Sequence, residues 1–155
     1  MAKRAPDEYC RQNYNQLRNL FDTAIDDHKR FEMVYAYGMS VGMVSAVVIS
    51  ISTSSYTSYA VGFDTKANEI VILPFNSDLS GHGEPVYLKK SEIKKVKQSF
   101  MTKEITIYDN RLPKKYVQFS VPDYLNQDED DVIMLVKQEE EYQKFMDFFK
   151  KKYNK

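Results

Sequence analysis

One loop of the sequence, residues 78–84, brings together the side-chain types of nucleophilic catalysis: a hydroxyl, an imidazole and two carboxylates. These candidates are Asp78, Ser80, His82 and Glu84. A histidine base can activate a serine only if the two groups come within hydrogen-bonding reach, about 2.6–3.2 Å. Close neighbours on one loop rarely achieve that geometry, and the two interspersed glycines are typical of a turn. We therefore expect a turn here, with a catalytic loop as the alternative.

The sequence contains few residues that could bind a metal or a cofactor. The acidic run Asp128–Asp131 offers oxygen ligands for calcium, but it lacks the glycine turn and distal glutamate of the helix-loop-helix calcium motif. A single cysteine, Cys10, and two histidines, His28 and His82, leave few nitrogen and sulfur ligands for a transition metal. Glycine-rich phosphate loops, paired-histidine helices and nucleophile elbows are missing from the sequence. The sequence therefore predicts no catalytic residues, no metal site and no cofactor.

Charge is distributed unevenly along a chain that is neutral as a whole, with 22 basic and 22 acidic residues. Residues 87–119 carry nine basic and three acidic side chains, whereas residues 120–147 carry two basic and nine acidic ones. The candidate basic patch consists of Lys89, Lys90, Lys94, Lys95, Lys97, Lys114 and Lys115. Such a patch could receive an acidic peptide, a phosphate or a membrane surface. Alternatively, and we favour this explanation, the two segments offset one another or the lysines protect edge strands from aggregation.

Nucleic acid is a weaker candidate partner. Aromatic rings alternate with lysines at Tyr87, Phe100, Tyr108 and Tyr116, an arrangement that some nucleic-acid-binding sheets use. The neutral chain gives no overall attraction to phosphates, and no aromatic ribonucleoprotein motif is present. We do not expect nucleic-acid binding.

The N-terminal segment predicts a helix over residues 6–30. Pro6 suits a first helical turn, and apolar side chains follow at spacings of three and four residues. This stripe comprises Cys10, Tyr14, Leu17, Phe21, Ala24 and His28. We expect the helix to pack on its own domain, and a homodimer through the stripe is the alternative. Because the N-terminus lacks the apolar core of a signal peptide and the chain has one cysteine, we expect a cytoplasmic protein.

Residues 33–63 contain no charged side chain. Residues 33–51, taken as a helix, would be apolar enough to span a membrane, with Gly38 and Gly42 at the spacing of membrane helix interfaces. The serines and tyrosines within the span and its β-branched run favour strands instead. We therefore expect two strands. A membrane-associated protein, anchored by residues 33–51 or held by the lysine patch, is the alternative.

The rest of the chain predicts a meander of short strands closed by a helix. Alternating apolar residues and turn signals delimit the strands. The expected strands are 69–75, 86–90, 94–100, 103–109, 116–121 and 132–136. In the third of these, Lys95 and Lys97 should point outward. Residues 138–153 form an amphipathic helix with glutamates in its first turn and lysines in its last. We expect one domain over 1–155, with its β region at 43–136.

The second half of the chain resembles bacterial members of the pleckstrin-homology-like (PH-like) family. The resemblance spans residues 56–153 and rests on the segments 87–97, 104–108, 116–121 and 145–149. It implies an α+β, mostly β fold: a split barrel of seven or eight antiparallel strands with a C-terminal helix, here with an added N-terminal helix. Family members that bind phosphoinositides carry basic residues in the first hairpin, whereas Ser52–Tyr59 carries none.

The functional expectation follows from these patterns. We expect a non-catalytic binding or scaffold module whose partner is another protein. A membrane-associated protein and a homodimeric structural protein are the two alternatives from other classes.

Overall fold

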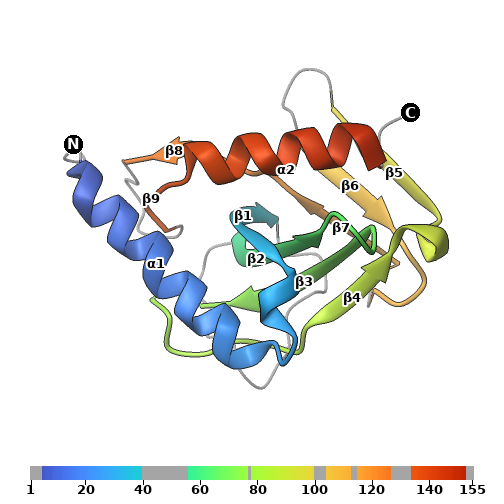
Figure 1. The fold of residues 1–155 in the computed structure, drawn as a ribbon, viewed down its shortest axis with the longest axis horizontal. Helices are drawn as coiled ribbons and strands as arrows, with labels where there is room; N and C mark the ends of the chain where they lie inside the picture. Colours follow the sequence, from blue (N-terminus) through green and yellow to red (C-terminus); the bar gives the residue numbers. More distant parts are fainter. Residues whose placement is uncertain are drawn as a thin grey trace.

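The computed structural model describes residues 5–39, 56–76, 78–99, 104–112, 115–126 and 134–152. Within these ranges the chain forms two α-helices and nine strands, which pair into three antiparallel sheets (Figure 1). The expected α+β, mostly β class is confirmed. The described strands close no barrel.

The first sheet has four strands in sequence order. They are β1 (Glu32–Met39), β2 (Tyr56–Asp64), β3 (Glu69–Phe75) and β4 (Val86–Lys89). The N-terminal helix covers one face, and the second sheet and the C-terminal helix cover the other. All seven residues of β3 are buried, because strands covered on both faces have no solvent side. This double cover explains why residues 33–39 and 56–63 carry no charge.

The expected pair of strands in the uncharged segment is confirmed where the structure describes it. Residues 33–39 belong to β1 and residues 56–63 belong to β2, while residues 40–55 lie outside the described ranges. The expected β region, 43–136, was wrong at its start, because β1 already begins at Glu32. The membrane helix considered for residues 33–51 is likewise wrong over residues 33–39. No helix in the described ranges is long and apolar enough to cross a bilayer.

The second sheet contains β5 (Lys95–Gln98), β6 (Ile105–Tyr108) and β7 (Tyr116–Phe119). It joins the first sheet where Tyr37 and Ser120 exchange backbone hydrogen bonds of 3.0 and 2.7 Å. Gly38 permits this junction, since a Cβ there would lie 2.1 Å from the Gln118 carbonyl oxygen. The membrane-interface role that the alternative membrane helix would give Gly38 is therefore wrong: the residue allows two strands to approach closely.

Helix α1 spans Asp7–Ala24, which is shorter than the expected 6–30. Ile25 is extended and buried, and the chain then turns into a single 3-10 turn, η1 (His28–Arg30). Arg18 stabilises this turn by donating hydrogen bonds to the carbonyl oxygens of His28 and Phe31, at 3.1 and 2.9 Å. The helix therefore ends at Ala24, where the buried Ile25 is extended and the Arg18 side chain holds the turn that leads to β1.

The C-terminal elements complete both cores. β8 (Tyr124–Leu125), which the sequence did not predict, pairs with β9 (Val136–Lys137), a shorter strand than the expected 132–136. Residues 127–133 lie outside the described ranges. Helix α2 spans Glu139–Lys152 and packs Phe145 and Phe148 on Phe63, with ring centroids 5.4 and 5.2 Å apart. α2 therefore packs on the face of the first sheet that lies opposite α1 (Figure 1).

Candidate functional site

The outer face of the second sheet combines lysines with tyrosine rings. Lys95 and Lys97 are exposed on β5, as the alternation predicts. Across the β5–β6 pair, Lys95 lies opposite Tyr108 of β6, and Lys97 lies opposite Thr106 of β6. Tyr108 in turn pairs with Tyr116 of β7, and their ring centroids are 6.1 Å apart. Directly paired residues share a face of a sheet, so two ammonium groups and two phenol rings lie on one surface.

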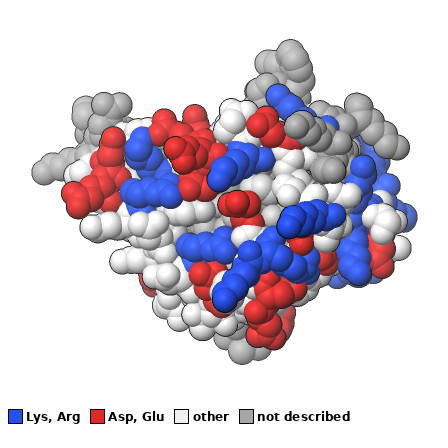
Figure 2. Space-filling model, in the orientation of Figure 1, with Lys and Arg blue, Asp and Glu red and all other residues white. Residues whose placement is uncertain are grey.

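Three more lysines lie beside this surface. Lys89 ends β4, Lys90 begins the 3-10 turn η2 (Lys90–Glu92), and Lys94 precedes β5; all three are exposed. Figure 2 shows Lys and Arg side chains gathered at the edge of the molecule where Figure 1 places η2 and β5. We call this surface the basic face and define it by Lys89, Lys90, Lys94, Lys95 and Lys97.

The other two residues of the expected patch are placed less clearly on this surface. Lys115 is exposed in the turn before β7, and its ammonium donates a hydrogen bond of 3.1 Å to the Asn110 carbonyl oxygen. Lys114 lies outside the described ranges. Five of the seven lysines are therefore exposed along the stretch of chain from the end of β4 through β5.

The five lysines of the basic face form no ion pair with any residue in the described ranges. Two acidic residues near these lysines, Asp109 and Glu92, instead form ion pairs with Arg111, at 2.5 and 3.0 Å. The acidic segment 120–147 gives no carboxylate to these lysines within the described part of the chain. β5 is the end strand of its sheet, so protection of an exposed edge remains a second explanation of its lysines.

The loop at residues 78–84 has the hydrogen bonds of a turn. Ser80 donates its backbone N–H to Asp78 at 2.9 Å, and its hydroxyl accepts the Asn76 amide at 2.9 Å. Hydrogen bonds from the Ser80 hydroxyl and N–H lower the pKa of Asp78. His82 contacts the Gly83 carbonyl oxygen at 2.9 Å, and Glu84 is exposed. Within the described ranges, the polar contacts of Ser80 go to Asn76 and Asp78, while His82 contacts a backbone oxygen.

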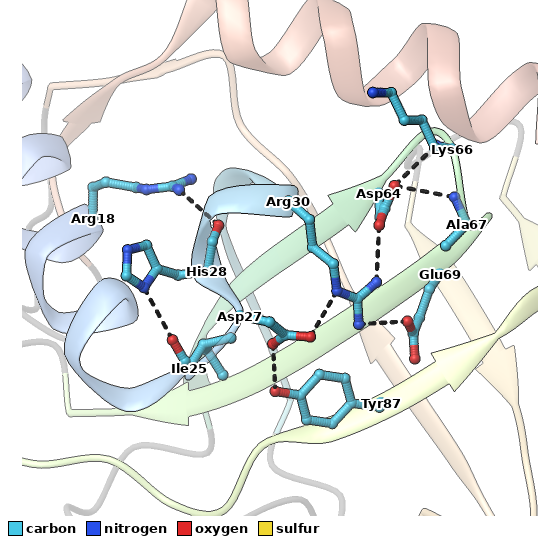
Figure 3. Close-up of polar contacts among 10 residues, drawn as sticks. All are labelled: Arg18, Ile25, Asp27, His28, Arg30, Asp64, Lys66, Ala67, Glu69 and Tyr87. Atoms are coloured by element: carbon cyan, nitrogen blue, oxygen red, sulfur yellow. Dashed lines mark hydrogen bonds and ion pairs between the residues drawn. The ribbon is translucent and has the colours of Figure 1, made fainter.

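A second polar site, which the sequence analysis missed, centres on Arg30 (Figure 3). Its guanidinium contacts three carboxylates: Asp27 at 2.6 Å, Asp64 at 2.8 Å and Glu69 at 2.7 Å. The side chains of Asp64 and Glu69 are only 8% and 6% exposed, so these carboxylates depend on Arg30. The cluster ties η1 to the hairpin of β2 and β3.

The electrostatics of the Arg30 cluster favour the charged forms. Burial opposes the charge of Arg30, but its hydrogen bonds to Asp64, Asp27 and Glu69 prevail and raise its pKa. Burial also opposes the charge of Asp64, but the Arg30 guanidinium and two backbone N–H groups of the turn lower its pKa. The pKa of Tyr87 is raised by burial and by the charge of Asp27, to which its hydroxyl donates at 3.3 Å.

The structure makes a cleft of about 290 Å³ beside this cluster. Its lining residues are Lys29, Arg30, Phe31, Glu32, Phe63, Asp64, Thr65 and Lys66. Among the charged lining residues, Arg30 pairs with Asp64, and Glu32 lies 3.9 Å from Lys144, which is not part of the lining. Lys29 and Lys66 form no ion pair within the described ranges. In the described ranges, His, Cys, Asp and Glu side chains form no group of three that could hold a metal ion. The Arg30 cluster beside the cleft is therefore a structural cluster of ion pairs.

Comparison with known proteins adds no relative: no family model, curated protein or solved structure matches the chain. The similarity to PH-like domains therefore remains a resemblance.

Proposed function

We propose that this protein is a non-catalytic binding module that recognises an acidic segment of a partner protein through the basic face. One observation carries the proposal: five exposed lysines lie within residues 89–97, and none is paired within the described ranges. Tyr108 and Tyr116 extend the surface with apolar ring area. Aromatic rings beside unpaired charges suit a protein ligand better than a bare phosphate. The ring faces offer apolar contact area, which the side chains of a protein segment can cover and a phosphate cannot.

The expected affinity is modest. Exposed ion pairs contribute about 0.2–1 kcal/mol each, so five of them support a transient contact that weakens with salt. We propose a PH-like split barrel as the fold family, supported by the order of the strands and the closing helix α2. Because Ser52–Tyr59 has no basic residue, phosphoinositide binding at the family's usual site is not part of the proposal. A cytoplasmic location agrees with the one thiol, Cys10, being free and buried.

The apolar stripe of α1 is not proposed as a dimer surface. Cys10, Tyr14, Leu17 and Phe21 are buried in the chain's own core, and the Tyr14 hydroxyl donates to the Met33 carbonyl oxygen of β1 at 2.7 Å. A homodimer through this stripe would first have to expose it. Catalysis by the 78–84 loop is not proposed either, because its hydrogen bonds serve the turn.

The test is binding of a fluorescently labelled octaglutamate peptide, followed by anisotropy at low ionic strength. We expect saturable binding that is lost in the double variant Lys95→Glu/Lys97→Glu. The matched control, Lys29→Glu/Lys66→Glu, makes the same change of net charge at exposed lysines that do not belong to the basic face, and should retain binding. Equal loss in both variants would show a general charge effect and contradict the proposal.

A membrane surface is the competing ligand of the same lysines. Cosedimentation with phosphatidylserine-containing vesicles provides that arm of the test. Binding to the vesicles without binding to octaglutamate would replace the proposed protein partner with a lipid surface.

A further inference from the structure

The basic face has a counterpart in the same molecule. Asp7 and Glu8 begin α1, Asp123 precedes β8, and Glu139 and Glu140 begin α2; all five side chains are exposed. We call this surface the acidic end. Its local cations, Arg11 and Lys137, pair with Glu141 and Glu139. The six carboxylates of this region thus exceed its two cations within the described ranges.

Backbone and side-chain contacts hold the parts of the acidic end together. Ala5 donates its N–H to the Asn126 carbonyl oxygen at 2.8 Å, and the Tyr124 hydroxyl bonds the Asp7 carboxylate. Gln138, which immediately precedes Glu139, donates its N–H to the Asp123 carbonyl oxygen at 3.0 Å. The starts of the two helices therefore meet beside β8 (Figure 1).

The acidic end and the basic face lie at opposite ends of the molecule. In Figure 2 acidic side chains, with a few basic ones among them, lie over the starts of α1 and α2, whereas Lys and Arg side chains gather at the edge formed by η2 and β5. No ion pair within the described ranges joins the two surfaces. Each surface is therefore available to a complementary surface on another molecule.

We infer that the acidic segment recognised by the basic face belongs to a second copy of this chain, in a head-to-tail contact. This inference rests on the proposed function, since it names the partner of the same surface. The equal numbers of basic and acidic residues, 22 each, leave no net repulsion between copies. Because the two surfaces differ and lie apart, each contact leaves one basic face and one acidic end free, so that further copies add.

The first test is the dependence of molecular mass on salt, measured by sedimentation velocity. Exposed charges act over about 30 Å at 0.01 M salt and over less than about 5 Å at 0.5 M salt. We expect mass to grow with protein concentration at the lower salt and to return to the monomer at the higher. A monomer at both salt concentrations, or association that survives the higher one, would overturn the inference.

Two charge-reversal variants sharpen the test. Lys95→Glu/Lys97→Glu removes the basic face, and Glu8→Lys/Glu140→Lys removes the acidic end, whose two altered residues have no polar partner within the described ranges. Each variant alone should be monomeric at low salt. Mixed together, they should form one-to-one dimers that do not grow, because each still has one intact surface. A mixture of two monomers, or continued growth, would contradict a head-to-tail contact.

Matched controls separate specific contact from net charge. Lys29→Glu/Lys66→Glu and Asp26→Lys/Asp147→Lys make the same changes of net charge at exposed residues outside both surfaces. Each should still associate on its own at low salt, and loss of association in both would overturn the inference. Urea unfolding checks that all variants are folded.

The octaglutamate measurement distinguishes the two proposals. Specific binding of octaglutamate by a chain that stays monomeric at low salt would overturn the second-copy inference and leave the proposed function standing. Absence of both binding and association would overturn both.

Discussion

Arg30 is the single cation on which three carboxylates converge, and its loss should be costly. Arg30→Met leaves Asp64 and Glu69 nearly buried without a counter-charge. Breaking a fully buried pair costs about 3–5 kcal/mol; because Arg30 is 34% exposed, we expect about 2–3 kcal/mol. The measurement is the free energy of unfolding in urea.

The control for this prediction is Asp27→Asn. The Asp27 side chain is 47% exposed, so its pair with Arg30 is a surface contact worth about 1 kcal/mol or less. Similar losses in both variants would mean that the buried carboxylates do not need Arg30.

The lowered pKa of Asp64 makes stability depend on pH. Asp64 is charged above its unfolded pKa, about 3.9, and in the folded state it stays charged to lower pH. The stabilisation is therefore complete well above pH 4 and disappears as the pH falls through the folded pKa. We expect the difference in unfolding free energy between wild type and Asp64→Asn to shrink steadily below about pH 4. A difference that grows on acidification would contradict the assignment.

At the residue scale, sequence patterns located exposed charges well and buried charges badly. Alternation along β5 correctly placed Lys95 and Lys97 on the solvent side. The same reasoning did not single out Asp64, or Glu69 at the start of the expected strand 69–75, although the two residues pair with each other in register and are buried. Their partner, Arg30, lies 34 residues from Asp64, and local periodicity carries no information about such a distant pair.

At the element scale, Gln138 takes the place of a neighbouring strand along β1. Its side-chain oxygen accepts the Tyr35 N–H at 2.7 Å, and its amide donates to the Tyr35 and Pro122 carbonyl oxygens at 3.0 and 2.6 Å. Gln138→Leu leaves these buried groups unpaired, so we expect a loss of roughly 2–4 kcal/mol in unfolding free energy.

The control repeats the same substitution on the exposed side of α2. Within the described ranges the Gln143 side chain hydrogen-bonds only Asp147, at 3.1 Å, so Gln143→Leu should change the unfolding free energy by about 0.5 kcal/mol or less. Equal losses of unfolding free energy in the two variants would show that the buried hydrogen bonds of Gln138 add nothing to stability.

Gly38 and Gly62 give a second matched comparison, this time of tight packing between elements. A Cβ at Gly38 meets the backbone oxygen of Gln118 at 2.1 Å, whereas one at Gly62 meets the ends of the Phe21 and Val71 side chains at 2.6 and 2.7 Å. Side chains can shift more easily than a strand. We expect Gly38→Ala to cost about 3 kcal/mol or more and Gly62→Ala about 1–2 kcal/mol in urea unfolding. The reverse order would contradict the assigned junction of β1 and β7.

The elements themselves followed from the sequence more readily than their ends. Alternation and apolar stripes predicted α1, α2 and the strands β2 to β7, since each buries one or two regular faces, whereas β1 lies before the expected start of the β region. The end of α1 was misjudged because His28 continues the helical spacing, while Ile25 and Arg18 close the helix through tertiary contacts. β8 was missed because its two residues are too few for a periodic signal, and β9 is shorter than the expected strand 132–136.

At the scale of the whole molecule, the first sheet lies between two layers. α1 and Val136 cover one face, and the second sheet with α2 covers the other. The sequence contained a trace of this arrangement, because a strand buried on both faces reads as a continuous apolar run. It could not show which layers cover it, since the layers come from opposite ends of the chain. The separation of the basic face from the acidic end also became visible only in three dimensions.

This layering predicts how amide hydrogen exchange varies across the molecule. The amides of Ile70–Leu73 lie in a strand bonded on both sides and buried on both faces, so they should exchange only through global unfolding. Directly after β5, Ser99 donates its N–H to the Glu104 carbonyl oxygen, so alternation turns the amides of Val96 and Gln98 away from β6. These two have no partner within the described ranges and should exchange fastest. High salt keeps the chain monomeric during the measurement, and protection of Val96 equal to that of Val71 would refute the open edge assigned to β5.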